Sequence, residues 1–189
     1  MTELEQHIKT LFGIQQQHLK RMAGLFVPAL LDKDAYFIRS GQYGVSLSFV
    51  KQGFLRVFEY KDGKDITQWI FTPGEFVTDL SSLVFDTPAR WNVQALTDCE
   101  LYSLSRGDYQ KIDTIVPQWK DLEKLFIAKC FLNLEDRVFS FLSMTAEERF
   151  LHLLEQNPDL FNQVPLHFIA SMLGMTPETL SRIRRKLIS

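Results

Sequence analysis

The chain has 189 residues, of which 46% are apolar and 13% aromatic, and its formal net charge at neutral pH is −2. This composition excludes a disordered chain, and the length suits one main domain with a small second one. The longest apolar run is interrupted by Pro28 and falls far short of the roughly 18 residues that a membrane span needs. The first residues also lack the basic start and apolar run of a signal peptide. The sequence therefore predicts a cytoplasmic protein with no membrane partner.

The charge is distributed unevenly along the chain. Residues 164–189 carry a net charge of +3, which leaves −5 for the rest. Glu178 is the one acidic residue of this segment, and its basic residues are Arg182, Arg184, Arg185 and Lys186. A basic end on an acidic body favours a polyanionic partner at that end, although basic helix ends are also common on solvated surfaces.

The first thirty residues are expected to be helical, because apolar residues such as Leu4, Ile8 and Leu11 recur at intervals of three and four. From Leu30 to Leu104 the pattern changes to short strands separated by turn residues. The strands are expected near residues 36–38, 45–50, 54–60, 66–71, 91–96 and 100–104. Asp62-Gly63 predicts a two-residue hairpin between the third and fourth of them. Short strands at regular spacing predict an antiparallel sandwich or barrel.

After Arg106 the pattern becomes helical again, with a short helix expected near 108–114 and a long one from 118 to about 143. One apolar row of the long helix has the spacing of a coiled-coil seam and comprises Ile127, Phe131, Leu134, Val138 and Phe141. A second row beside it comprises Leu125, Ala128, Leu132, Phe139 and Leu142. The two rows form either one wide face buried in its own core, or two faces with different roles. Two stripes of this length exceed what a small β domain covers. We therefore favour one row packing on the β domain and the other on a partner helix in a homodimer.

Thr145 and Glu148 have the spacing of a capping box, which predicts the start of a new helix. The long helix is then expected to end near Met144, and this joint is the natural hinge. The predicted division of the chain is 1–114, 115–144 and 145–189.

The last 25 residues match the steric needs of a helix-turn-helix, in which two short helices cross closely about a tight turn. Gly174 suits the turn, Ala170 suits the small inward position, and Thr176 with Pro177 suits the start of the second helix. The inward apolar positions are filled by Leu166, Ile169, Leu173, Met175, Leu180 and Ile183. A helical hairpin that packs on its own domain would explain the same pattern less completely.

The second helix then presents donors and acceptors that suit the major groove of DNA. Arg182 can donate to guanine and Glu178 can accept from cytosine, whereas Arg184, Arg185 and Lys186 suit phosphates. The candidate DNA-binding residues are Thr176, Glu178, Thr179, Ser181, Arg182, Arg184, Arg185 and Lys186.

Over almost its whole length the chain resembles the Crp/Fnr superfamily of bacterial transcription regulators. The resemblance is carried by Asp62-Gly63-Lys64, by the turn Pro73-Gly74-Glu75-Phe76, and by the segment TPETLSRIRRKL at 176–187. It implies an α+β fold with a jelly-roll-like antiparallel β-roll sensor domain, a long dimerisation helix and a C-terminal helix-turn-helix. The implied partners are double-stranded DNA, a second copy of the chain, RNA polymerase and a small-molecule effector.

By the same resemblance, Glu178, Thr179 and Arg182 match positions that contact DNA. Pro177 replaces an arginine at the family's first contact position, which implies a different DNA site. The β-hairpin wing that usually follows this helix in the family is expected to be absent or vestigial.

The resemblance also implies an effector pocket formed by Gly74, Glu75, Thr78, Asp79, Ala89 and Arg90. Cyclic-nucleotide-binding relatives hold cAMP or cGMP there with a Gly-Glu pair and an arginine. Thr78-Asp79 replaces the Gly-Glu pair, and Arg90 falls one place late, which turns a strand side chain to the other face unless a bulge near Pro88 corrects it. A cyclic nucleotide, another small ligand and a vestigial pocket all remain open, and the first is the least favoured.

Other chemistries find less support in the sequence. Cys99 and Cys130 are too few for an iron–sulfur cluster and are expected to be reduced, with no metal role. The four histidines are scattered, and no catalytic motif is present. The sequence therefore predicts a non-enzymatic regulator. The alternative is a cyclic-nucleotide-binding-like module that acts through protein contacts without binding DNA.

Overall fold

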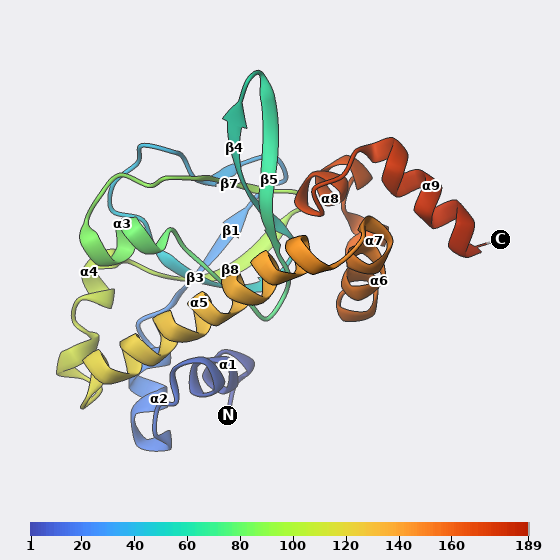
Figure 1. The fold of residues 1–189 in the computed structure, drawn as a ribbon. Helices are drawn as coiled ribbons and strands as arrows, with labels where there is room; N and C mark the ends of the chain where they lie inside the picture. Colours follow the sequence, from blue (N-terminus) through green and yellow to red (C-terminus); the bar gives the residue numbers. More distant parts are fainter. Residues whose placement is uncertain (189) are drawn as a thin grey trace.

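The computed structural model describes residues 1–188, with side chains as far as Lys186. Ser189, the last residue of the predicted third segment, lies outside the described residues. The chain combines helices with two four-stranded antiparallel sheets, and the helices at both ends of the chain flank the β structure (Figure 1). The expected α+β class with an antiparallel β-roll, a long helix and a C-terminal helical part is confirmed.

The two sheets face each other and are hydrogen-bonded in the orders β1-β8-β3-β6 and β2-β7-β4-β5. The strands are β1 (Val27–Leu31), β2 (Tyr36–Ile38), β3 (Leu47–Gln52), β4 (Leu55–Lys61), β5 (Lys64–Phe71), β6 (Phe76–Val77), β7 (Asn92–Ala95) and β8 (Cys99–Leu104). Their inward side chains, such as Phe49, Leu55 and Leu104, are fully buried and form the core. The six predicted strands are confirmed within a few residues.

The predicted hairpin is formed by β4 and β5. Asp62 and Gly63 connect these strands with φ values of 53° and 74°. Two successive residues with positive φ match the twist of the flanking strands, which is why Asp-Gly is favoured here. This hairpin extends beyond the rest of its sheet (Figure 1).

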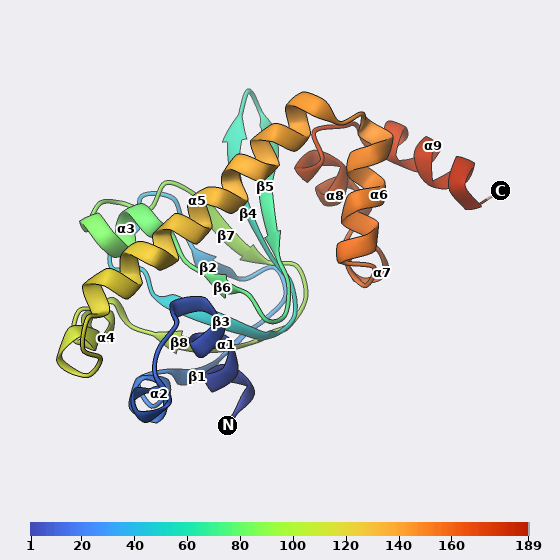
Figure 2. The same cartoon turned by 60° about the horizontal axis from the view of Figure 1, so that its bottom comes forward.

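Two helices precede the β structure, namely α1 (Glu3–Phe12) and α2 (Gln16–Ala23). The prediction of helix through the first thirty residues is wrong beyond Ala23, because β1 begins at Val27 and pairs with β8. Gly24 and Pro28 suit this change, since neither favours a helix interior. Helix α1 lies close to the long helix (Figure 2). The ring centroids of Phe12 and Phe126 are 4.9 Å apart.

Short helices connect the last strands to the long helix. The predicted helix near 108–114 is present as α4 (Arg106–Tyr109) and a 3-10 turn, η1 (Ile112–Thr114). Helix α3 (Leu80–Phe85) was not predicted, and it lies within the region read as strands. It is only six residues long, and Asp79 caps it by accepting a hydrogen bond from the Ser82 backbone N–H at 3.0 Å.

The long helix, α5 (Trp119–Ser143), packs on the β-roll through residues outside both predicted apolar rows. Trp119 and Phe126 are buried, and Leu122 and Cys130 pack against the same core. The expectation that one of the two rows faces the β domain is therefore wrong. The periodicity located both apolar rows correctly, but α5 is apolar around most of its circumference. The β-roll packs against a third face of the helix, which lies outside both rows.

Four helices follow: α6 (Ala146–Gln156), α7 (Leu160–Gln163), α8 (Leu166–Met172) and α9 (Pro177–Ile188). The predicted joint is confirmed, since α5 ends at Ser143 and the Thr145–Glu148 capping box opens α6. These helices share a buried cluster with Phe54, Ile70 and Leu96 of the β-roll. Within residues 1–188 no helix has the length and apolar character to cross a membrane.

Candidate nucleic-acid interface and effector site

The turn between α8 and α9 has the geometry expected of a helix-turn-helix. Gly174 has a φ of 67°, and the Met175 backbone N–H donates to the Ala170 carbonyl at 3.0 Å. A Cβ atom at Gly174 would lie 2.6 Å from the ring of Phe141 on α5. Glycine is therefore required here for two reasons: the backbone has a positive φ, and an aromatic ring leaves no room for a Cβ atom.

The inward positions of both helices are filled as predicted. Ala170, Ile169 and Leu180 are fully buried, and Leu173 and Ile183 are nearly so. Leu166 and Met175 pack at the edge of the same cluster. The small side chain of Ala170 lets the two helices cross closely, so α9 is held with one face outward.

The outward face of α9 carries most of the candidate DNA-binding residues. Thr176, Glu178, Ser181, Arg182 and Arg185 are exposed. The Thr176 hydroxyl accepts a hydrogen bond from the Thr179 backbone N–H at 3.2 Å and so caps the helix. Hydrogen bonds from its own backbone N–H and from the Thr176 side chain lower the pKa of Glu178, so this carboxylate stays ionised as an acceptor. The N-terminal half of α9 thus offers one acceptor and one guanidinium to a partner.

The remaining candidates on α9 are differently placed. Thr179 and Arg184 are half-buried, and Lys186 forms an ion pair with Glu147 of α6 at 2.8 Å. A phosphate would therefore compete with Glu147 for the Lys186 ammonium. The pair is exposed, so it is easily exchanged.

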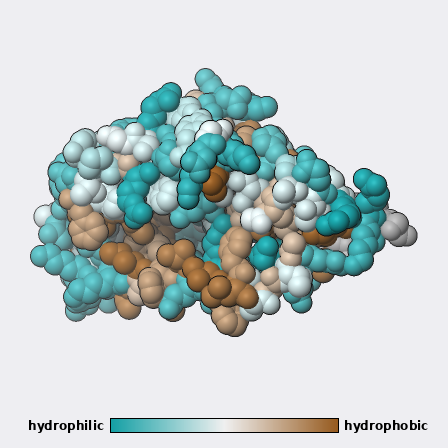
Figure 3. Space-filling view, turned by 45° about the horizontal axis from the view of Figure 1, so that its top comes forward, coloured by the Kyte–Doolittle hydropathy of each residue, from teal (hydrophilic) through white to brown (hydrophobic). Residues whose placement is uncertain are grey.

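The predicted seam of α5 is exposed along its whole length. Its five residues are between 37% and 58% exposed: Ile127, Phe131, Leu134, Val138 and Phe141. The second row is exposed as well. A band of apolar side chains crosses the lower half of the molecule in Figure 3. An apolar surface of this extent is typical of a protein contact.

At the predicted effector pocket, the Asp79 carboxylate bonds to groups of its own chain. It accepts hydrogen bonds from the Ser82 backbone N–H at 3.0 Å, the Ser81 hydroxyl at 2.8 Å and the Arg90 backbone N–H at 2.7 Å. The side chain is only 4% exposed. Asp79 therefore closes the loop between β6 and β7. The hydroxyls of Thr78 and Ser82 are buried nearby without a partner.

The other predicted pocket residues do not converge on one point. Ala89 is buried, whereas the Arg90 side chain is exposed and lies 5.3 Å from the Trp91 ring. The backbone thus keeps Arg90 on the outer side. The Glu75 carboxylate accepts from the Thr72 hydroxyl at 2.9 Å, and burial raises its pKa. A Cβ at Gly74 would lie 3.1 Å from the ring of His7.

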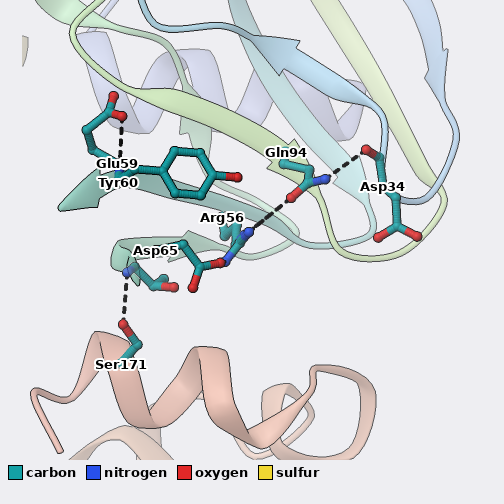
Figure 4. A network of polar contacts seen from close by, with 8 residues as sticks. Asp34, Arg56, Glu59, Tyr60, Asp65, Gln94 and Ser171 are labelled. Atoms are coloured by element: carbon teal, nitrogen blue, oxygen red, sulfur yellow. Dashed lines mark hydrogen bonds and ion pairs between the residues drawn. The ribbon is translucent and has the colours of Figure 1, made fainter. Parts of the chain in front are cut away.

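The structure brings together a second set of residues that the sequence did not indicate. The β4–β5 hairpin packs on α8, and the Thr67 backbone N–H donates to the Ser171 hydroxyl at 2.9 Å (Figure 4). Arg56, paired with Asp65, lies 3.9 Å from the ring of Phe168 on α8. These residues are far apart in sequence and their contacts follow no motif.

A cleft opens beside this contact, and we call it the hairpin cleft. Its walls are residues 59–61 and 66–68 of the hairpin, Trp91, the C-terminal half of α5, and Ser171, Met172 and Gly174. Its volume is about 520 Å³. None of the six predicted pocket residues lines it.

Comparison with known proteins supports this fold. Residues 30–113 match the family model described as "Cyclic nucleotide-binding domain". No curated protein matches the chain. Among solved structures, FixK2 from Bradyrhizobium japonicum is similar with a TM-score of 0.70 and 22% identity, covering 86% of this chain and 84% of that one. Residues 30–113 therefore resemble a cyclic-nucleotide-binding domain, and the fold of the chain as a whole resembles that of FixK2.

Two further structures show how far the likeness extends. The c-di-GMP responsive global regulator CLP from Xanthomonas campestris has a TM-score of 0.66 and 18% identity, covering 92% of this chain and 91% of that one. The regulatory domain of Toxoplasma gondii PKA with cAMP has a TM-score of 0.54 and 22% identity, covering 60% of this chain. The match spans only 43% of that protein's chain. CLP is thus similar along the helices as well as the β-roll.

Proposed function

We propose that this protein is a sequence-specific, DNA-binding transcription regulator. The observation that carries the proposal is the placement of α9, whose N-terminal half projects Glu178 and Arg182 outward while α8 packs behind it. A helix held in this way suits the major groove, where an arginine reads guanine and a carboxylate reads cytosine. CLP, which is similar over most of its length, is described as a regulator linked to gene expression.

In this proposal residues 1–114 form the sensor, residues 115–144 the dimerisation helix and residues 145–189 the DNA-binding part. The β-roll controls the orientation of α9, because α8 packs on β5 and the two parts share a buried cluster. The likeness to other regulators is the sole support for contact with RNA polymerase.

Binding to a randomised duplex pool, followed by sequencing of the bound fraction, tests the proposal. We expect a two-fold symmetric consensus with half-sites about 34 Å apart and an affinity that falls steeply with salt. Repeating the selection with cAMP or cGMP tests the predicted effector pocket at the same time. No enrichment at any salt concentration, with or without a nucleotide, contradicts the proposal and favours the module that acts through protein contacts.

We further propose that a second copy of the chain covers the exposed seam of α5 from Ile127 to Val138, whereas Phe141 at the end of the seam lines the hairpin cleft. A Phe131→Asp substitution places a charge in the middle of that seam and is expected to abolish self-association in analytical ultracentrifugation. Asp136→Lys, also exposed on α5 but outside both apolar rows, is the matched control and is expected to leave association unchanged. Equal behaviour of the two variants would place the interface elsewhere.

A further inference from the structure

The hairpin cleft has the size and the walls of a small-molecule site. Its volume of about 520 Å³ lies within the range of ligand pockets. Tyr60, Trp91 and Phe141 supply aromatic rings from three separate elements. Such walls favour a flat, largely apolar ligand.

One charged side chain in the cleft lacks an acidic partner. Arg137 of α5 is half-buried and donates one hydrogen bond, at 2.8 Å to the Met172 carbonyl. Its guanidinium otherwise lies near the rings of Trp69 and Phe141, at 5.1 and 5.3 Å. Burial lowers the pKa of Arg137, although an arginine remains charged. Within the described residues no carboxylate forms an ion pair with it.

A second polar group in the same wall is also unsatisfied. Thr67 is only 2% exposed, and its hydroxyl is buried without a hydrogen-bond partner. Its backbone N–H is used by Ser171, and its hydroxyl has no exposed surface, so a ligand acceptor reaches this hydroxyl only when the cleft wall shifts. A buried hydroxyl without a partner costs stability, and a bound acceptor removes that cost.

We propose that the hairpin cleft binds a small aromatic carboxylic acid, whose carboxylate pairs with Arg137 and Thr67 and whose ring lies among Tyr60, Trp91 and Phe141. An Arg fork and a carboxylate form the strong, bidentate type of hydrogen bond. The single guanidinium balances one negative charge.

The charges of the cleft favour a monoanion. Its walls carry Glu59, whose carboxylate accepts from the Tyr60 backbone N–H at 2.9 Å, together with Lys61 and Arg137. One acidic and two basic residues give these walls a net charge of +1. A monoanion with an apolar body balances this charge, whereas a phosphate dianion exceeds it.

The position of the cleft gives the ligand a regulatory role, and this part rests on the proposed function. A molecule there contacts the hairpin, α5 and the turn at Gly174 together. It therefore stabilises the observed packing of α8 on β5 and biases the direction in which α9 points. A ligand acts in this way only through its differential affinity for the two arrangements.

Saturation-transfer NMR on the full chain tests the binding, with phenylacetate and indoleacetate as probes and their neutral amides as controls. We expect both acids to bind and the amides to bind about tenfold more weakly, because the charge-assisted hydrogen bond is lost. In a heteronuclear NMR spectrum of the isotope-labelled protein, the Trp91 indole signal is expected to shift, whereas that of Trp119, buried in the β-roll core, stays in place. Failure of both acids at millimolar concentration, or equal binding of acids and amides, overturns the proposal.

Variants separate the site from nonspecific binding. Arg137→Met keeps the apolar stem and is expected to lose most acid binding, while Arg21→Gln, exposed on α2, retains it. Should Arg137→Met fail to fold, Thr67→Val serves instead and is expected to weaken acid binding about two- to fivefold. Unchanged binding in that variant also overturns the proposal. No DNA is present in these measurements, so failure of the proposed function would leave a positive result standing.

Discussion

The loop around Asp79, between β6 and β7, and the hairpin cleft around Arg137 differ in how their charged groups are satisfied. In the loop, three donors from the protein itself satisfy the Asp79 carboxylate, and the Arg90 side chain lies outside. In the cleft, Arg137 has a single carbonyl partner, and the neighbouring Thr67 hydroxyl has none. A charge satisfied internally stabilises the fold, whereas a half-buried charge without a counterion favours a ligand.

The difference shows that a resemblance to a family does not by itself identify the chemistry of a particular loop. The loop keeps the position of a cyclic-nucleotide cassette, and residues 30–113 match that family. Its one buried charge, the Asp79 carboxylate, is nevertheless satisfied within the chain, although the buried hydroxyls of Thr78 and Ser82 have no partner. The four predictions below test this contrast, beginning with the largest expected effect.

Gly174→Ala is expected to destabilise the protein by about 2–5 kcal/mol. The backbone at position 174 has a φ of 67°, which is left-handed and strained for alanine. The new Cβ would also lie 2.6 Å from the Phe141 ring in the cleft wall. Urea unfolding measures the loss. Gly63→Ala is the matched control, because its φ is 74° but nothing lies within 4 Å of its Cβ. Equal losses for the two variants would show that the contact with Phe141 contributes nothing.

Asp79→Ala is expected to cost about 2–3 kcal/mol, because it removes a helix cap and leaves two further donors without an acceptor. The Ser82 and Arg90 backbone N–H groups both depend on this carboxylate. Asp159→Ala is the matched control, because Asp159 is exposed at the start of α7 and its side chain makes no capping hydrogen bond. Little change in stability is expected for this variant. A stable Asp79→Ala variant that loses affinity for cAMP would reverse the assignment and make this loop the ligand site.

Arg182→Ala is expected to cost about 1–3 kcal/mol of DNA affinity at one base position and to relax the preference there. Lys186→Ala is expected to weaken binding to all sequences alike and to flatten the salt dependence. Anisotropy titrations on the selected site and on single-base variants measure both effects. An equal loss on every sequence for Arg182→Ala would make that residue a phosphate contact.

Thr67→Val is expected to stabilise the free protein by up to about 1 kcal/mol, since it replaces an unsatisfied buried hydroxyl with a methyl group of similar size. Thr97→Val is the control, because the Thr97 hydroxyl accepts a hydrogen bond from the Phe54 backbone N–H at 3.1 Å. Thermal unfolding measures the stability of both variants relative to the unchanged protein. Destabilisation by Thr67→Val would show that its hydroxyl has a partner in solution.

Features governed by neighbouring residues were predictable from the sequence. The turn at Asp62-Gly63, the cap at Thr145 and the glycine at position 174 each follow from local backbone preferences. The spacing of apolar residues likewise located α5 and the inward side of α9. Helix α3 escaped notice because its six residues are too few to show a period.

Features governed by distant residues were not predictable. The shape of the core decides which face of α5 packs on the β-roll, and the face that packs there is the one that carries Phe126. Whether Asp79 is free for a ligand depends on the Arg90 backbone N–H, eleven residues away.

The sequence by itself determined the order of elements, the β4–β5 hairpin and the turn between α8 and α9, because each rests on contacts within a few residues. The tertiary structure alone decided that α8 packs on β5, that Arg137 and Thr67 share a cleft, and that both apolar rows of α5 face outward. These outcomes depend on the burial of groups far apart in the chain. Burial is settled only when the whole core packs.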